Sequence, residues 1–137
     1  MKEIPRFDSE TSTVRDAVYD MDIIKPMAEQ IPVEHIPLTR LLERTSEGNY
    51  YWNDKQGKRL GPAQLLKDWE AAQHNPDWAD HVQGIQRADM DEPLWMTREG
   101  HVFNGMHRLT RHILEKSETV PVRIFDELPE EAKVDKQ

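Results

Sequence analysis

The stretch GHVFNGMHRL, residues 100–109, decides the fold of this chain, because it predicts a strand, a tight turn and the start of a helix. Upstream, the apolar and β-prone residues 93–97 and 101–103 are separated by Arg98-Glu99-Gly100, a spacing typical of a hairpin with a short glycine loop. Downstream, apolar residues recur at helical spacing up to Leu114, so an amphipathic helix should begin near Gly105. The sequence therefore predicts a hairpin that leads directly into a helix.

The turn between this strand and this helix has the chemistry of an anion site. We expect Asn104 to cap the helix and Gly105 to allow close approach to the backbone. A helix start exposes unpaired N–H groups with partial positive charge, and basic side chains nearby add donors for phosphate oxygens. The predicted phosphate-binding residues are Asn104, Gly105, Met106, His107, Arg108 and Arg111. The alternative is an ordinary surface turn, since Asn-Gly is a common hairpin dipeptide and surface His-Arg pairs are frequent.

Length and composition are those of one modest domain, with 137 residues of which 36% are hydrophobic and 32% charged. The absence of cysteine excludes disulfides, thiolate metal sites and cysteine nucleophiles, and it fits a reducing cytoplasm. The first residues lack an apolar export segment, and nowhere do eighteen apolar residues run together. We therefore expect a cytoplasmic protein with no membrane partner.

The charge of the chain is unevenly distributed. A formal net charge of −8 argues against a broad, nonspecific grip on nucleic acid, which requires clustered Lys and Arg. Residues 98–124, however, carry five Lys or Arg against three acids, whereas the rest of the chain carries 13 against 23. The local excess of positive charge coincides with the predicted turn and suits a small anion.

The rest of the chain divides into short predicted elements. They are an edge strand over 31–38, a helix over 40–44 capped by Thr39, a loop or small hairpin over 45–61, a helix from Pro62 through Trp69 that ends before 74–76, a helix over 77–88 and a last strand over 119–125. Residues 1–30 are interpreted as an N-terminal extension, part of which is a short helix, and 126–137 as an acidic C-terminal tail.

Two further groups of residues have open interpretations. The aromatic run Tyr50-Tyr51-Trp52 is either buried packing or a platform or lid against a nucleotide base. Asp77 and His81 stand one helical turn apart, but the spacing fixes no third ligand, so no metal site is predicted.

Three motifs lie within residues 93–125, namely Pro-Leu-Trp-Met, Val-Phe-Asn-Gly-Met-His-Arg-Leu and Thr-Val-Pro-Val-Arg-Ile-Phe. They carry the resemblance of residues 31–125 to the core of the ParB/sulfiredoxin superfamily. In that superfamily the turn reads Gly-Glu-Arg-Arg, Gly-Cys-His-Arg or Asp-Gly-His-His-Arg and holds nucleotide phosphates. The resemblance implies a single small α/β (α+β) domain, with a mixed sheet flanked by helices. It also implies ATP or ADP as the bound nucleotide, with Mg²⁺ as a candidate companion.

Departures from the family motifs narrow the implied activity. Sulfiredoxin chemistry needs a cysteine where Met106 stands, so that activity is excluded. ParB proteins add a helix-turn-helix and a dimerisation segment, for which 137 residues leave little room. The turn of the free-serine kinases is the most similar, and it implies ATP hydrolysis or phosphoryl transfer to a small-molecule acceptor. Here Asn104 replaces the acid and Met106 replaces one histidine.

Two acids are the candidate catalytic residues. Glu34, on the first strand, is the candidate base, unless it is an outward strand residue in solvent. Asp89, with Asp91, could bind Mg²⁺ together with the phosphates, or could be a solvated acid at a helix end. The leading hypothesis is an ATP- or ADP-dependent phosphotransferase or NTPase. The alternative is a catalytically silent module, plasmid- or phage-associated, that recruits a protein or DNA partner.

Overall fold

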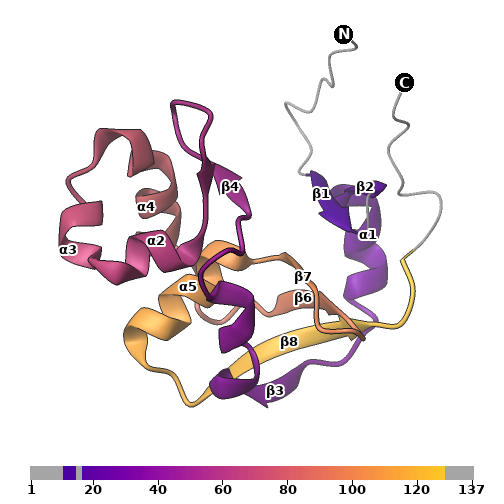
Figure 1. The fold of residues 1–137 in the computed structure, drawn as a ribbon. Helices are drawn as coiled ribbons and strands as arrows, with labels where there is room; N and C mark the ends of the chain where they lie inside the picture. Colours follow the sequence, from indigo (N-terminus) through magenta and orange to yellow (C-terminus); the bar gives the residue numbers. More distant parts are fainter. Residues whose placement is uncertain (1–10, 15–16, 129–137) are drawn as a thin grey trace, which may run out of the picture.

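A four-stranded mixed sheet forms the centre of the fold, with the strand order β3-β8-β6-β7 (Figure 1). The structure is a computed structural model, and it describes residues 11–14 and 17–128. The strands of this sheet are β3 (Glu34–Pro37), β6 (Leu94–Thr97), β7 (Val102–Asn104) and β8 (Thr119–Phe125). Strand β8 is antiparallel to β3 and parallel to β6, and β6 is antiparallel to β7. The predicted α/β domain with a mixed sheet is therefore confirmed.

Short helices and two small hairpins surround the sheet. The α-helices are α1 (Met21–Ala28), α2 (Pro62–Lys67), α3 (Trp69–Ala72), α4 (Ala79–Gln86) and α5 (Met106–Glu115). The 3₁₀ helices are η1 (Leu38–Arg40), η2 (Leu42–Thr45) and η3 (Pro76–Trp78). One hairpin pairs β1 (Thr11–Val14) with β2 (Ala17–Asp20), and the other pairs β4 (Trp52–Asn53) with β5 (Arg59–Leu60).

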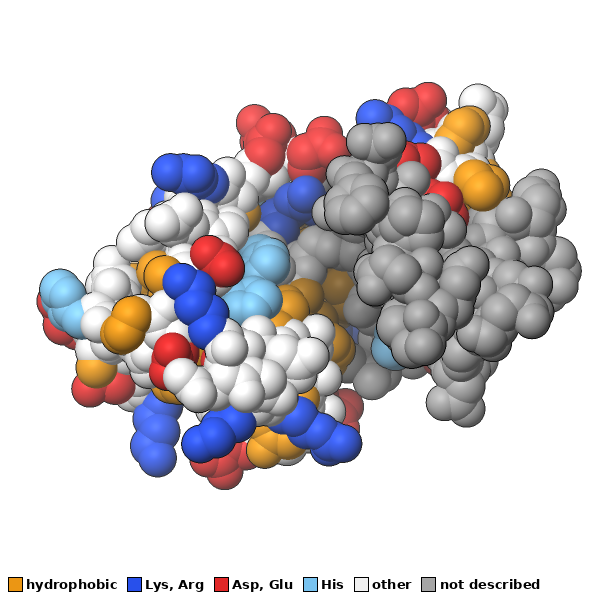
Figure 2. Space-filling view, turned by 90° about the horizontal axis from the view of Figure 1, so that it is seen from above, with side chains coloured by type: hydrophobic (Ala, Val, Ile, Leu, Met, Phe, Trp, Pro, Cys, Tyr) orange, Lys and Arg blue, Asp and Glu red, His pale blue; other side chains and the backbone are white. Residues whose placement is uncertain are grey.

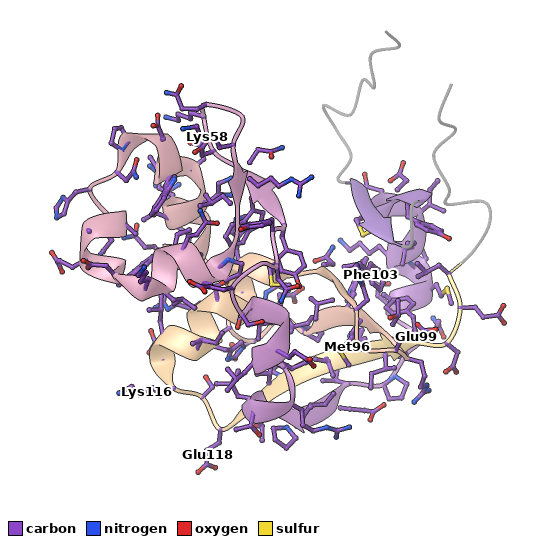
Figure 3. All side chains as sticks on the ribbon, in the orientation of Figure 1. Lys58, Met96, Glu99, Phe103, Lys116 and Glu118 are labelled. Atoms are coloured by element: carbon purple, nitrogen blue, oxygen red, sulfur yellow. The ribbon has the colours of Figure 1, made fainter. Side chains whose placement is uncertain are left out.

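The predicted hairpin of β6 and β7 is confirmed. Thr97 N donates to His101 O at 2.8 Å, and Gly100 N donates to Thr97 O at 2.9 Å. Gly100 takes the left-handed backbone conformation, with φ of 96°, that a short hairpin loop requires. Glu99 lies at the outer end of this loop, and Lys58 lies at the tip of the β4–β5 hairpin (Figure 3).

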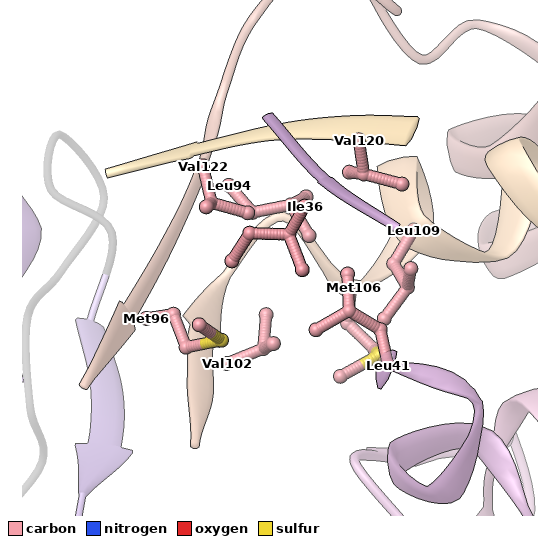
Figure 4. Packing of buried hydrophobic residues seen from close by; sticks show 9 residues of the cluster. All are labelled: Ile36, Leu41, Leu94, Met96, Val102, Met106, Leu109, Val120 and Val122. Carbon is pink, nitrogen blue, oxygen red and sulfur yellow. The ribbon is translucent and has the colours of Figure 1, made fainter. Parts of the chain in front are cut away.

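One face of the sheet packs against α5 and forms the sheet cluster. Along β8, Val120 and Val122 point to this face, because successive side chains of a strand alternate between faces. The cluster consists of Ile36, Leu41, Leu94, Met96, Val102, Met106, Leu109, Val120 and Val122 (Figure 4). Because Met106 and Leu109 belong to the first turns of α5, this packing fixes where the helix begins relative to the sheet.

The opposite face of the sheet packs against α1. Phe103 and Phe125 meet there edge to face with ring centroids 5.2 Å apart, and Ile24 of α1 is fully buried against them. Arg123, on the same face of β8, donates from Nη1 to Ala28 O at 3.0 Å and also to Ile31 O. The guanidinium therefore satisfies the carbonyl of Ala28, the last residue of α1, which lies in the segment interpreted from sequence as an extension, and that of Ile31 just after it.

A third cluster joins α2, α3 and α4 on the side of α5 away from α1 (Figure 1). It contains Leu60, Leu65, Ala72, Val82 and Ile85, all buried. Trp52 of β4 packs against both this cluster and the sheet cluster. The β4–β5 hairpin is thereby packed against helices α2, α3 and α4.

The predicted helix over 40–44 is wrong. The chain forms the 3₁₀ helices η1 and η2 instead, separated by Leu41 with φ of −106°. A five-residue segment is too short to nucleate an α-helix on its own, and Leu41 is 3% exposed because it inserts into the sheet cluster between the two turns.

Two other predicted helices are real but interrupted. The helix from Pro62 breaks at Asp68, whose side chain accepts from Ala71 N at 3.1 Å and so caps α3. The helix predicted over 77–88 begins as η3, with Asn75 capping Asp77 N at 2.9 Å, and only then becomes α4. The last strand is confirmed with its predicted bounds.

Both ends of the chain extend beyond what the structure describes. Residues 1–10 and 15–16 of the predicted extension and 129–137 of the predicted tail lie outside the described residues. Within 11–14 and 17–128, no helix combines the length and the apolar character needed to cross a bilayer.

Candidate functional site

Gly105 makes the turn from β7 into α5. Its φ of 103° is left-handed, and a Cβ at this position would lie 2.7 Å from Leu94 Cδ2 and 2.8 Å from Arg108 Nη1. Because that conformation disfavours L side chains and these neighbours fill the space, the turn needs glycine. The predicted start of the helix near Gly105 is confirmed, since α5 begins at Met106.

Asn104 does not cap the helix, which corrects the sequence expectation. Asn104 belongs to β7 and pairs with Trp95, so Gly105 takes the N-cap position and no side chain caps α5. The first internal bond of the helix runs from Leu109 N to Gly105 O at 2.8 Å, which leaves the N–H groups of the first turn outside the helical pattern. The end of α5 next to the sheet therefore carries the partial positive charge of an uncapped helix start.

The side chains of the predicted phosphate site have different surroundings. Met106 is 8% exposed and belongs to the sheet cluster, so only its backbone can serve a ligand. Arg108 donates from Nη1 to Pro93 O at 3.2 Å and lies beside the turn. Arg111 donates to the carbonyls of Ile85 and Gln86 at 3.3 and 2.6 Å and pairs with Glu115. Arg111 thus stabilises the C-terminal end of α4, and Arg108 is the arginine adjacent to the turn.

His107 lies against Trp52 and His81, which come from β4 and α4. The ring centroids of His107 and His81 are 4.6 and 4.9 Å from that of Trp52, and both rings lie at 16° to the indole plane. The two imidazole centroids are only 5.2 Å apart. If the two imidazoles lay on opposite faces of the indole, their centroids would be separated by roughly the sum of their distances from the Trp52 centroid, 4.6 and 4.9 Å. Both histidines therefore lie side by side on one face of Trp52.

A hydrogen-bond chain links this histidine pair, His81 and His107, to the β4 backbone. His81 Nε2 is 2.9 Å from Asn53 O, and His81 Nδ1 is 3.0 Å from His107 Nε2. Because a carbonyl can only accept, Nε2 of His81 carries the hydrogen, and in a neutral ring Nδ1 must then accept. It follows that His107 donates from Nε2, and its remaining Nδ1 is an acceptor.

Burial, followed by electrostatic repulsion from His81 and Arg108, lowers the pKa of His107 from 6.5 to about 4. Its imidazole is therefore neutral at pH 7 and adds no positive charge to the turn. Both members of the pair are partly exposed. Figure 2 shows that histidine side chains reach the molecular surface among charged neighbours on the face seen from above. The pair connects α4, α5 and β4 at the start of α5.

The two candidate catalytic acids lie apart from each other. Glu34 is exposed on the edge strand β3, which β8 and β6 separate from β7, a span of three strand spacings or about 14 Å. Asp89 is exposed in a turn after α4, where its carboxylate accepts from Asp91 N at 3.0 Å. This turn leads to Pro93, whose carbonyl binds Arg108, so Asp89 belongs to the loop beside the site.

The sequence relates His81 to Asp77, one helical turn away, but gives no sign of its contact with His107. The two histidines are 26 residues apart and lie on different helices, so no local periodicity relates them. Asp77 instead interacts with the β4–β5 loop, where its Oδ1 accepts from Gln56 Nε2 at 3.4 Å. Among the residues that the structure describes, no three His, Cys, Asp or Glu side chains group as metal ligands.

Comparisons with family models, curated proteins and solved structures found no match to this chain. The likeness of residues 31–125 to the ParB/sulfiredoxin superfamily therefore rests on the quoted sequence motifs.

Proposed function

We propose that this chain is a nucleotide-binding domain of the ParB/sulfiredoxin type that binds ATP or ADP with the phosphates at the N-terminus of α5. The observation that carries the proposal is the start of α5 after Gly105, where no side chain caps the helix and the N–H groups of the first turn lie outside the helical hydrogen-bond pattern. Phosphate groups bind helix N-termini because these N–H groups and the helix dipole both favour negative charge.

In this proposal the backbone binds the phosphates and Arg108 supplies the positive charge. The N–H groups of Gly105, Met106 and His107 donate to phosphate oxygens, and the Arg108 guanidinium turns from Pro93 O toward the ligand. The neutral His107 ring holds Trp52 in place instead of adding a cation. Arg111 stabilises the packing of α5 against α4 by donating to the carbonyl of Gln86, the last residue of α4.

Calorimetric titration of ATP, ADP, CTP and GTP with Mg²⁺ tests the proposal. We expect Arg108→Ala to weaken ATP binding at least about tenfold, since charge-assisted hydrogen bonds to phosphate are lost. Arg98→Ala is the matched control, because Arg98 is an exposed arginine in the β6–β7 turn, far from Gly105, that pairs with Asp126 just after β8. The absence of heat with every nucleotide, or equal losses in the two variants, would contradict the proposal. Thermal melting of each variant without ligand controls for folding.

A second candidate function adds turnover, as a phosphotransferase or NTPase with Mg²⁺ and a small-molecule acceptor. What favours it is the position of Asp89 in the loop that ends at Pro93, the residue bonded to Arg108. Steady ADP production that Asp89→Asn abolishes and Glu34→Gln leaves unchanged would support this function. Nucleotide binding without turnover would support the silent module that recruits a protein or DNA partner.

A further inference from the structure

A surface hollow of about 480 Å³ lies beside Trp52, between the β4–β5 hairpin and the β6–β7 turn. We call it the aromatic hollow, and the lining residues that matter here are Tyr50, Tyr51, Trp52, Asn53, Arg59 and His101. Its volume is within the range of small-molecule sites, and its lining combines aromatic faces with a few polar groups, as ligand sites do.

The backbone that carries these aromatic residues is held firmly. Asn49 Nδ2 donates to Glu43 O at 2.8 Å and to Ser46 Oγ at 3.0 Å. Gly61 allows the chain to pass closely, because a Cβ there would lie 2.1 Å from Asn49 O. Tyr51 N donates to Leu60 O at 3.2 Å. The hollow is therefore pre-formed by the turn and hairpin backbone.

The aromatic side chains of the hollow differ in exposure, and Tyr51 and Trp52 are partly buried. Tyr50 is 46% exposed, which leaves a large ring partly in water. Trp52 has one face covered by the histidine pair and also lines the hollow. Arg59 is exposed and brings a guanidinium to the same hollow.

We propose that the aromatic hollow binds the purine base of the nucleotide whose phosphates meet α5, an inference that rests on the proposed function. Bases stack on Tyr and Trp rings and on arginine planes. Purines fit best, because Asn matches the N6 and N7 edge of adenine and Arg matches the O6 and N7 edge of guanine. Asn49, Asn53 and Arg59 are the residues of these types in the hollow. The Asn49 amide already donates to Glu43 O and Ser46 Oγ, so Asn53 and Arg59 are the candidates that read the base.

Trp52 connects the base site with the phosphate site. It lines the hollow and stacks on His107, which is the second residue of α5. In this proposal one nucleotide extends from the hollow along Trp52 to the helix start, although no residue of 104–108 lines the hollow itself. The hairpin that carries Trp52 gives the base specificity, while the helix start recognises the phosphates of any nucleotide.

The test separates the base from the phosphates by comparing ATP with inorganic tripolyphosphate. We expect Tyr50→Ala to weaken ATP binding about tenfold and to leave the Kd of tripolyphosphate unchanged. Tyr50→Phe keeps the ring and should bind ATP like the wild type. Ile23→Ala is the matched control, since Ile23 is an equally exposed residue, 45%, on α1. An unchanged Kd of ATP in Tyr50→Ala would overturn the proposal.

Two further arms distinguish this inference from the proposed function. If tripolyphosphate fails to bind the wild type, the phosphate site is refuted, and the hollow is then tested with adenosine by tryptophan fluorescence. Adenosine binding that Tyr50→Ala removes supports the hollow, and no adenosine binding overturns it. Equal affinity for adenosine and uridine would overturn the assignment to purines.

Discussion

At the scale of single residues, Gly105→Ala tests whether the turn into α5 depends on glycine. The new Cβ would force a left-handed conformation on alanine and collide with Leu94, which is fully buried and cannot move into solvent. We expect the free energy of unfolding to fall by about 2 to 4 kcal/mol, the sum of backbone strain and overpacking. Urea unfolding measures this change.

Gly57→Ala is the matched control for this prediction. Gly57 also has a positive φ, 82°, but a Cβ there meets nothing within 4 Å. Only backbone strain remains, so we expect a loss of about 1 kcal/mol. Equal losses in the two variants would mean that the space around Gly105 is not restricted.

The buried imidazole of His107 makes stability depend on pH. Its pKa is lowered to about 4 in the folded state, so between pH 6.5 and 4 the unfolded chain binds the proton and the folded chain does not. The free energy of unfolding is therefore unaffected by this group above pH 6.5. It decreases as pH falls from 6.5 to 4, by up to about 3 kcal/mol. Burial also lowers the pKa of His112, which acts in the same direction.

Urea unfolding from pH 7 to pH 4 measures this dependence. The variant His107→Asn should reduce the slope of stability against pH in this range. His74→Asn is the control. The His74 side chain is 77% exposed and pairs with Glu70 of α3. If His107→Asn kept the wild-type slope, the histidine pair would not be the titrating group.

At the scale of elements, Arg123 joins α1 to the sheet. Its guanidinium donates to the carbonyls of Ala28 and Ile31, and Arg123→Met would leave these carbonyls without that donor while keeping the apolar stem. We expect a loss of about 1 to 3 kcal/mol and faster hydrogen exchange of the α1 amides. Arg98→Met, which removes an exposed ion pair with Asp126, should cost less than about 1 kcal/mol.

The elements that sequence predicted best have strong local signals. The β6–β7 hairpin has a glycine loop, β8 alternates apolar residues along its length, and α5 starts just after Gly105. The weak predictions concern segments in which a polar side chain or a tertiary contact overrides helical spacing. Asp68 bonds locally and splits one helix, and Leu41 inserts into the core and replaces another with 3₁₀ turns.

At the scale of the whole molecule, the site combines one predicted part with one that the sequence does not reveal. The turn from Asn104 to Arg108 is contiguous, so its backbone could be anticipated from residue types. The stacking of Trp52 on the histidine pair brings together residues from three elements far apart in the chain. Such contacts depend on how helices and hairpin pack, which single-sequence periodicity does not encode.

A ¹H–¹⁵N NMR titration of the chain with ATP tests phosphate binding at the start of α5 most directly. We expect large chemical-shift changes at the backbone amides of residues 105–108 with ATP, and the same changes at these amides with inorganic tripolyphosphate. Amides of the β6–β7 turn such as Glu99, at the far end of that hairpin, should not respond to tripolyphosphate (Figure 3). Amides of 105–108 that stay unchanged with tripolyphosphate would contradict phosphate binding at the start of α5.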